Sequence, residues 1–425
     1  MLAVLTEKDN INIKNVIEGD DRLLKSALIF GANASGKSNF LNAISFMKEM
    51  LFDSVKDISS NIAAKAIPFI LDAANVKKPT EIEVIFVYDN LKYRYGLSLL
   101  QGKVNEEWLY YTPSIRETKL FEREGMKITI NKSSFSEAER FIDQENSTVL
   151  KTRDNVPFVS VLASFNGLHS GNIISWFKNL NVISGIQESG FKSFTMDLIR
   201  ESKEFNEWAV DVLKSFQISG LSVEEVELKD VFSKVSSNNK SMNKILEGVK
   251  EFQGEKNYTI KVKKKMKKGE IDFPISFESE GTKKVIHLLG PIYDSMVNGK
   301  VLFIDEFDSK FHTLLSKYLF RLFNSDFNKN SQMVCVAQDA NLMSTDIFRR
   351  DQIWFVDKSE DGSSSLYSLV EFKEKNRNLR KEYGDRYLKG NYDAIPLFDD
   401  CDFIDSIMDE DCEYEDDMRS EHGKE

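Results

Sequence analysis

An eight-residue segment, Gly31 to Ser38, most constrains what this chain can fold into. Its sequence is GANASGKS; an apolar run, Ala27 to Phe30, precedes it, and residues 39–51 follow it with apolar side chains at helical spacing. Glycines in a turn between a strand and a helix let backbone N–H groups approach phosphate oxygens, which the helix N-terminus also attracts. This segment, the phosphate loop, therefore predicts a nucleotide-binding site.

The residues of the phosphate loop have different expected roles. Lys37 is expected to reach the terminal phosphates of ATP, and the Ser38 hydroxyl is placed to bind Mg²⁺. The other expected contacts to the nucleotide come from Gly31, Asn33, Ala34, Ser35, Gly36 and Asn39. The alternative, a glycine-rich turn without a ligand, is disfavoured by the strand before it and the helix after it.

A second cluster follows another apolar run, residues 301–304, and consists of Asp305 and Glu306. Two carboxylates at the end of a strand beside a phosphate loop suit nucleotide hydrolysis. Asp305 would orient Mg²⁺, and Glu306 would orient the attacking water or accept its proton. Acidic pairs often end strands, so the acidic pair alone is weak evidence for hydrolysis, and the phosphate loop makes it strong.

A third cluster, residues 278–282 (ESEGT), stands where a helix is expected to begin. Ser279 can cap that helix, and Gly281 leaves room for a phosphate to approach the backbone. An ordinary helix cap is the alternative interpretation. The position of the cluster, shortly before the strand that ends at Asp305, matches the signature motif of ABC-type ATPases.

Length and patterning predict the organisation of the chain. Its 425 residues allow two or three domain-sized units. Residues 1–134 are expected to hold the phosphate loop and an antiparallel β layer, including a hairpin over 81–99. Residues 135–253 are expected to form a mainly helical insertion, and residues 254–398 a parallel α/β half. Helices are expected near 136–145, 173–179, 194–216 and 242–252.

The net charge of −11 is located in one place. Residues 399–425 contain thirteen Asp or Glu against two basic residues, and this difference equals the whole net charge. The remaining chain has 55 acidic and 55 basic residues. We therefore expect an electroneutral body and an acidic, disordered tail over 399–425.

The sequence favours a cytoplasmic protein without a membrane segment. It contains no run of eighteen apolar residues, and four acidic residues within the first twenty are incompatible with a secretory signal. The three cysteines have no metal-ligand spacing, and their odd number suits a reducing compartment.

Taken together, these motifs resemble the cytosolic ABC-like AAA ATPases of the RloA and abortive-infection type, which are related to the RecF, SMC and OLD-nuclease ATPases. The resemblance reaches to about residue 398. The segments that carry it are GANASGKSNFLNAI, WAVDVLKSFQISGLSVEEV, ESEGTKK, VLFIDEFDSKFH, RRDQIWFVDK and RYLKGNYDAIP.

The resemblance implies an α/β P-loop NTPase of ABC-ATPase type, with a mixed sheet, an antiparallel β layer and a large helical insertion. It also implies a homodimer or higher oligomer in which ATP is sandwiched between the phosphate loop of one copy and Ser279 and Gly281 of the other. In such a family Glu306 is the catalytic glutamate, Asp305 the Walker B aspartate, and Asp308-Ser309 the loop at the dimer interface.

Two features depart from the family pattern. Gln338 occupies the position of a catalytic histidine; its amide can donate a hydrogen bond to phosphate but carries no charge, so slow hydrolysis is expected. The family's opening strand is missing, and Met1 to Ala3 resembles what normally follows it. This suggests a late start site or a truncated variant.

Two functions stay open at this point. The main hypothesis is an ATP-driven dimerisation switch in anti-phage defence that controls a separately encoded effector, because no nuclease, protease or membrane motif is recognisable. The alternative is a RecF-like or SMC-like DNA-binding maintenance ATPase. Six lysines within residues 261–268 (KVKKKMKK) could contact nucleic-acid phosphates, or could guard an ordinary hairpin.

Overall fold

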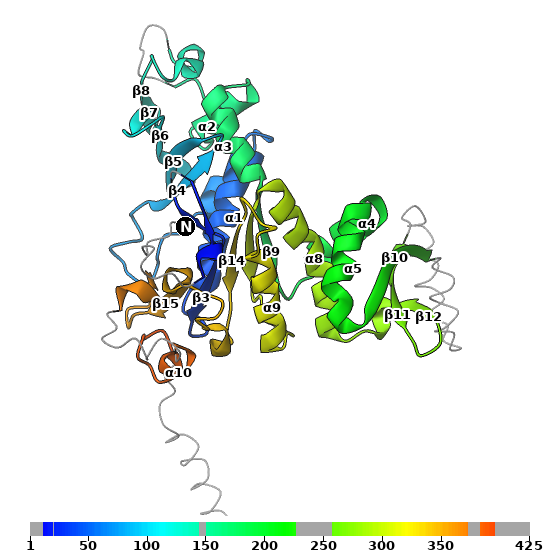
Figure 1. Cartoon of the computed structure of the whole chain (residues 1–425). Helices are drawn as coiled ribbons and strands as arrows, with labels where there is room; N and C mark the ends of the chain where they lie inside the picture. The colour runs from blue at the N-terminus through cyan, green and yellow to red at the C-terminus, as the bar shows by residue number, and fades with distance from the viewer. Residues whose placement is uncertain (1–11, 20, 144–149, 227–256, 373–382, 396–425) are drawn as a thin grey trace, which may run out of the picture.

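A six-stranded sheet at the centre of the molecule positions the predicted motifs (Figure 1). The computed structural model describes residues 12–19, 21–143, 150–226, 257–372 and 383–395. The strand order is β16-β15-β3-β14-β13-β9, and all neighbours are parallel except the β15–β16 pair. The strands are β3 (Ser26–Gly31), β9 (Leu180–Ser184), β13 (Val301–Asp305), β14 (Gln332–Val336), β15 (Ile353–Lys358) and β16 (Ser364–Ser368).

Alternation along the central strands separates two apolar cores. Leu28 and Phe30 of β3 belong to the largest buried cluster, whereas Ile29 belongs to a smaller one on the other face. Helix α1 (Lys37–Asp53) contributes Leu41 to the smaller cluster. Because successive side chains of a strand point to opposite faces, one apolar run supplies both cores.

A five-stranded antiparallel sheet forms a separate layer beside the central sheet (Figure 1). Its strands, in spatial order, are β4 (Thr80–Tyr88), β5 (Leu91–Leu100), β6 (Lys103–Thr112), β7 (Thr118–Glu124) and β8 (Lys127–Ile130). The predicted hairpin is β4–β5; Asp89 and Asn90 both have positive φ, as a two-residue hairpin turn requires. Helices α2 (Phe158–Ser164) and α3 (Leu168–Lys178) share a core with this sheet.

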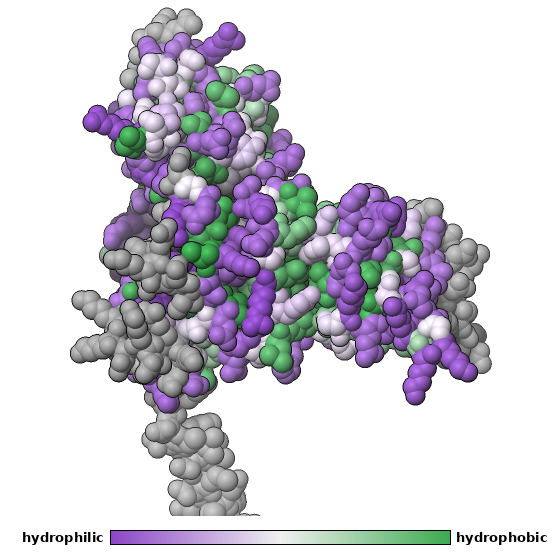
Figure 2. All heavy atoms as spheres, viewed as in Figure 1, coloured by the Kyte–Doolittle hydropathy of each residue, from purple (hydrophilic) through white to green (hydrophobic). Residues whose placement is uncertain are grey.

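A third body contains the helix that follows the ESEGT segment. It combines α4 (Ser189–Glu201), α5 (Lys203–Leu213) and α8 (Glu280–Asn298) with a sheet of β10 (Ile218–Val226), β11 (Asn257–Lys265) and β12 (Glu270–Pro274). The single helix predicted over 194–216 is two helices, because the Ser202 hydroxyl caps α5 by accepting from the Phe205 N–H. On the face drawn in Figure 2, apolar residues gather over α8 and α9 (Thr313–Phe323), between this body and the central sheet.

The described part of the segment 135–253 contains two strands beside its helices α2 to α5. Within it, β9 pairs in parallel with β13 at the edge of the central sheet, and β10 pairs with β11. The expected helix at 136–145 is a short 3-10 helix, Ser136–Phe141. The five-residue run of β9 is too short to show periodicity, and its partner β13 lies far along the chain.

Smaller elements complete the described chain. These are β1 (Val16–Ile17), β2 (Leu23–Leu24), α10 (Tyr383–Leu388) and several 3-10 turns. The expected helix at 242–252, the acidic tail at 399–425 and Met1 to Ala3 lie outside the described residues. Within the described ranges, no helix combines the length and apolar character needed to cross a membrane.

Candidate active site

One cavity of about 460 Å³ brings together most of the predicted site residues. It lies where β3, β13 and β14 end, since the carboxyl ends of parallel strands meet at one edge of a sheet. Its lining residues are Asn33, Ala34, Ser35, Gly36, Lys37, Ser38, Asn39, Asp305, Glu306, Val336 and Gln338. Gly31, Ser279 and Gly281 are the predicted site residues that do not line it.

The backbone of the phosphate loop needs its glycines. Gly36 precedes α1 with φ +104°, a conformation that other residues rarely adopt. A Cβ on Gly31 would lie 2.4 Å from the Val356 carbonyl oxygen. The Ser364 hydroxyl on β16 donates to the Ser35 carbonyl at 2.6 Å and would also meet a Cβ on Gly36. The neighbouring strands β15 and β16 therefore fix the shape of the loop.

Lys37 is buried and folded back onto the loop. Its ammonium donates to the carbonyls of Gly31 and Ala32, both at 2.7 Å. Burial lowers the pKa of Lys37, and the negative charges of Asp305 and Glu306 partly oppose that shift. The lysine is thus the cation that balances the acidic side of the cavity.

Asp305, the last residue of β13, and Glu306, which follows it, have distinct backbone conformations. Asp305 ends the strand, and its carboxylate accepts from the Glu306 N–H at 3.1 Å. Glu306 has φ +49°, in the left-handed region. Such a conformation costs about 1–3 kcal/mol for a residue other than glycine and persists where surrounding contacts hold it.

Asp308 connects the loop after β13 to the loop after β14. Its carboxylate accepts from the backbone N–H groups of Gln338 and Asp339, at 2.9 and 2.6 Å. Gln338 is exposed and lines the cavity from this loop. The position of Gln338 therefore depends on the loop that begins at Glu306.

The cavity has the donor set that a nucleotide and Mg²⁺ need. The Ser35 hydroxyl is buried and has no hydrogen-bond partner among the described residues, and Lys37 faces the cavity from the start of a helix. Ser38 and Asp305 supply two oxygen ligands, and Mg²⁺ bound to nucleotides takes its other ligands from phosphate and water. Across the described residues, no cluster of three or more His, Cys, Asp or Glu could hold a metal alone.

Ser279 and Gly281 lie at the exposed N-terminus of α8. The Ser279 hydroxyl accepts from the Thr282 N–H at 3.2 Å, so it is the helix cap that the sequence predicts. None of the residues that line the nucleotide cavity comes from α8. The Ser279–Gly281 turn, called the signature turn below, therefore contributes no residue to the nucleotide cavity of its own chain.

The lysine-rich segment forms the predicted hairpin, β11–β12. Three of its lysines form ion pairs: Lys261 with Glu224, Lys263 with Glu270, and Lys264 with Glu278. Ion pairs of Lys265, Lys267 and Lys268 with other described residues are absent. Among the described residues, three of the six lysines therefore have acidic partners, which favours the interpretation as a lysine-guarded hairpin.

Sequence reasoning missed Ser364 as a support of the phosphate loop. A single serine near Gly362 carries no motif, and it lies 329 residues from its partner Ser35. The role of Asp308 in holding Gln338 was likewise not predicted. The strand pairing of the central sheet brings these segments together.

Comparison with protein families decides the class of the chain. A family model described as "AAA domain, putative AbiEii toxin, Type IV TA system" matches residues 26–344. The chain belongs to this family. The match begins at β3, spans the phosphate loop, the signature turn and Asp305-Glu306, and ends after Gln338. The chain is therefore an ATPase-type AAA protein, and the family implies nucleotide binding.

Several solved structures are similar to this chain in fold. They include an SMC head bound to the C-winged helix domain of ScpA (14% identity, 81% of this chain and 89% of that chain, TM-score 0.40). An SMC head domain from Thermotoga maritima is 13% identical, with 83% of this chain and 97% of that chain covered and a TM-score of 0.38. A third structure is an Smc head domain with an extended coiled coil bound to the C-terminal domain of ScpA, derived from Pyrococcus furiosus. It is 14% identical, with 83% of this chain and 94% of that chain covered and a TM-score of 0.37. No curated protein is significantly similar.

The predicted fold class is confirmed. The protein is an α/β P-loop NTPase of ABC-ATPase type, with a mixed central sheet and a separate antiparallel layer. The phosphate loop follows the central strand β3, and the acidic pair ends β13, separated from β3 by β14.

Proposed function

We propose that this protein is a slow ATPase that works as an ATP-driven dimerisation switch. One observation carries the proposal: the signature turn is exposed at a helix N-terminus and contributes nothing to the nucleotide cavity of its own chain. Backbone N–H groups at such a terminus attract phosphate. A second copy of the chain would supply that phosphate, so that each ATP is held between the phosphate loop of one copy and the signature turn of the other.

Within this proposal, the residues of the cavity take the following roles. Lys37 and the N–H groups of the phosphate loop bind the ATP phosphates, and Ser38 and Asp305 would hold Mg²⁺, which would supply positive charge to the phosphates. Glu306 orients the attacking water and accepts its proton. Gln338 donates a hydrogen bond to the terminal phosphate. An uncharged donor gives less stabilisation than a charged one, which is why slow turnover is expected.

The family description supports a proposal for the biological role. It names a putative AbiEii toxin of a type IV TA system. We infer a role in anti-phage defence, in which ATP-dependent closure of the dimer controls a separately encoded effector. The test is a pull-down from native cells with Glu306→Gln protein, in the presence and absence of ATP. Recovery of one defined partner only with ATP supports the role, and recovery of no partner under either condition contradicts it.

Substituting Ser279 by arginine is expected to prevent dimerisation while leaving ATP binding intact. The bulky cation would block the face that meets the other copy, whereas the nucleotide cavity of the same chain is untouched. Light scattering on Glu306→Gln protein with ATP should show dimers, and the double variant should stay monomeric. Ser202→Arg is the matched control, because Ser202 caps α5 as Ser279 caps α8. ATP-dependent dimers of the Ser279→Arg double variant would contradict the arrangement.

Substituting Gln338 by alanine is expected to lower kcat at least about tenfold with little change in ATP affinity, because a donor to the transition state is removed. Asp308 would still hold the backbone of residues 338 and 339. Gln338→His should restore or exceed the wild-type rate. Single-turnover kinetics measures all three proteins, and an unchanged rate in the alanine variant would remove Gln338 from the catalytic residues.

A further inference from the structure

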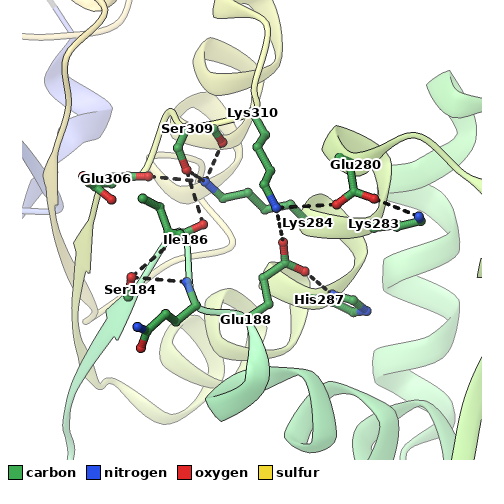
Figure 3. A network of polar contacts seen from close by, with 12 residues as sticks. Ser184, Ile186, Glu188, Glu280, Lys283, Lys284, His287, Glu306, Ser309 and Lys310 are labelled. Carbon is green, nitrogen blue, oxygen red and sulfur yellow. Dashed lines mark hydrogen bonds and ion pairs between the residues drawn. The ribbon is translucent and has the colours of Figure 1, made fainter. Parts of the chain in front are cut away.

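Lys284, on α8, three residues after Gly281, is a buried cation with several hydrogen-bond acceptors around it. Its side chain is fully buried, and its ammonium donates to the carbonyls of Phe307 and Ser309, at 2.8 and 2.7 Å. It also donates to the Ser309 hydroxyl at 2.8 Å and to the Glu306 carbonyl at 3.3 Å (Figure 3). The ammonium group of Lys284, on α8, is therefore bonded by several groups of the loop that begins at Glu306.

The same loop, residues 306–310, also contacts the signature turn itself. A Cβ on Gly281 would lie 2.9 Å from the Lys310 carbonyl oxygen, so only glycine allows this close approach. The Lys310 ammonium lies 3.5 Å from both the Glu280 and the Glu188 carboxylates. Glu188 also contacts His287 Nδ1 at 2.6 Å (Figure 3). Helix α8 and the 306–310 loop are thus joined at both the helix start and its second turn.

This connection matters because of the conformation of Glu306. Its left-handed backbone is unfavourable for a glutamate and requires contacts that hold it. Lys284 supplies such contacts, since it bonds the carbonyls on both sides of the turn. A movement of the α8 N-terminus would therefore change the direction in which the Glu306 side chain points.

We propose that Lys284 is a positioning residue that couples the signature turn to Glu306. Through Lys284, the signature turn, which binds the ATP of the partner copy, moves together with the 306–310 loop, which acts on the ATP of its own chain. Engagement of the partner would then place Glu306 for hydrolysis in the chain's own site. This inference deepens the proposed function and rests on it.

An apolar residue would be the simpler choice at this buried position. Replacing buried charges by well-packed apolar residues is often neutral or stabilising. Burial lowers the pKa of Lys284 to about 8, which reflects the unfavourable environment of its charge. The Phe311 ring, 4.4 Å from the ammonium, and the backbone carbonyls compensate in part. A lysine that only fills space would not need these partners.

The test compares Lys284→Met with wild type and with Lys25→Met. Methionine keeps the length of the side chain and removes the donors. Lys25 is a matched control, because it is also a buried lysine that donates to a carbonyl, that of Ser325, but it precedes β3 at the far end of the strand. Kinetics against ATP concentration and equilibrium binding of ATP are measured for each protein.

The expected result for Lys284→Met is a fall in kcat of about 10- to 100-fold, because a misplaced catalytic group has costs of this order. The Kd for ATP should stay within about twofold, since the phosphate loop is untouched. Any sigmoidal dependence of the wild-type rate on ATP should also become hyperbolic. Lys25→Met should behave as wild type in all three respects.

The pH profile gives a readout that a merely structural lysine would not change. Between pH 7 and 9 the wild-type kcat should fall with a midpoint near 8, because a neutral amine has fewer donors for its four acceptors. Lys284→Met should lack this step. The other titratable groups that face the ammonium are Asp308, Glu188, Lys310 and Cys335, and they are present in both proteins.

The possible outcomes distinguish a failure of the proposed function from a failure of the coupling by Lys284. A wild-type protein without ATP turnover would remove the proposed function and this inference together. Turnover in wild type with equal kcat and pH profile in Lys284→Met would overturn the inference alone. If Lys284→Met does not fold, Ser309→Ala removes one acceptor and keeps the ammonium. A reduced kcat at unchanged Kd in that variant supports the coupling, and an unchanged kcat contradicts it.

Discussion

Replacing Glu306 by glutamine is expected to lower ATP turnover by about 10²- to 10⁴-fold, the usual contribution of a general base. Glutamine has the same shape and can take the same backbone conformation, but it cannot accept a proton. ATP binding should be preserved, because the phosphate loop and Asp305 are unchanged. The variant should therefore accumulate as an ATP-bound dimer.

Phosphate release under single-turnover conditions measures this effect. Glu49→Gln is a matched control, because Glu49 lies on α1 and pairs with Lys65 at the surface. That control should hydrolyse ATP as the wild type does. Equal turnover in Glu306→Gln and wild type would remove the catalytic assignment of Glu306.

Replacing Lys37 by alanine is expected to weaken ATP binding by roughly 30-fold or more. Truncating one partner of a buried charge pair costs about 2–5 kcal/mol, which lowers affinity by roughly 30-fold or more. The loss also leaves Asp305 and Glu306 without the cation that balances them, so the cavity would repel the ATP phosphates. Both effects act in the same direction.

Titration with a fluorescent ATP analogue measures this affinity. Lys48→Ala is the matched control, because Lys48 lies on the same helix and donates to the Leu180 carbonyl, away from the nucleotide cavity. It should bind ATP normally. Unchanged affinity in Lys37→Ala, in a protein with an unchanged melting temperature, would contradict the site.

The parts of the site that could be predicted from sequence are those encoded locally. The phosphate loop and Asp305-Glu306 each follow an apolar run, and each run becomes a buried strand whose end is fixed by its own residues. The predicted β4–β5 hairpin is local in the same way, since Asp89 and Asn90 specify its turn.

The parts that could not be predicted depend on contacts between distant segments. Strand β9 is defined by its pairing with β13, and Ser364 gains its role only because β16 passes the phosphate loop. Lys284 is an intermediate case. It lies four residues before Leu288 on the buried side of α8, so helical spacing could have marked it as a buried charge. Its partners could not have been named from the sequence.

The central claim is that each ATP site is made by two copies of the chain, and mixing two inactive variants tests it most directly. Lys37→Ala lacks a working phosphate loop, and Ser279→Arg lacks a working signature turn. In a head-to-tail dimer of one copy of each, one site would contain both defects and the other neither, so one unblocked interface with a working phosphate loop remains, whereas a Ser279→Arg homodimer has no unblocked interface. The account predicts that an equimolar mixture regains ATPase activity, up to about a quarter of wild type, although neither variant is active alone. A mixture as inactive as its two components would contradict the composite site.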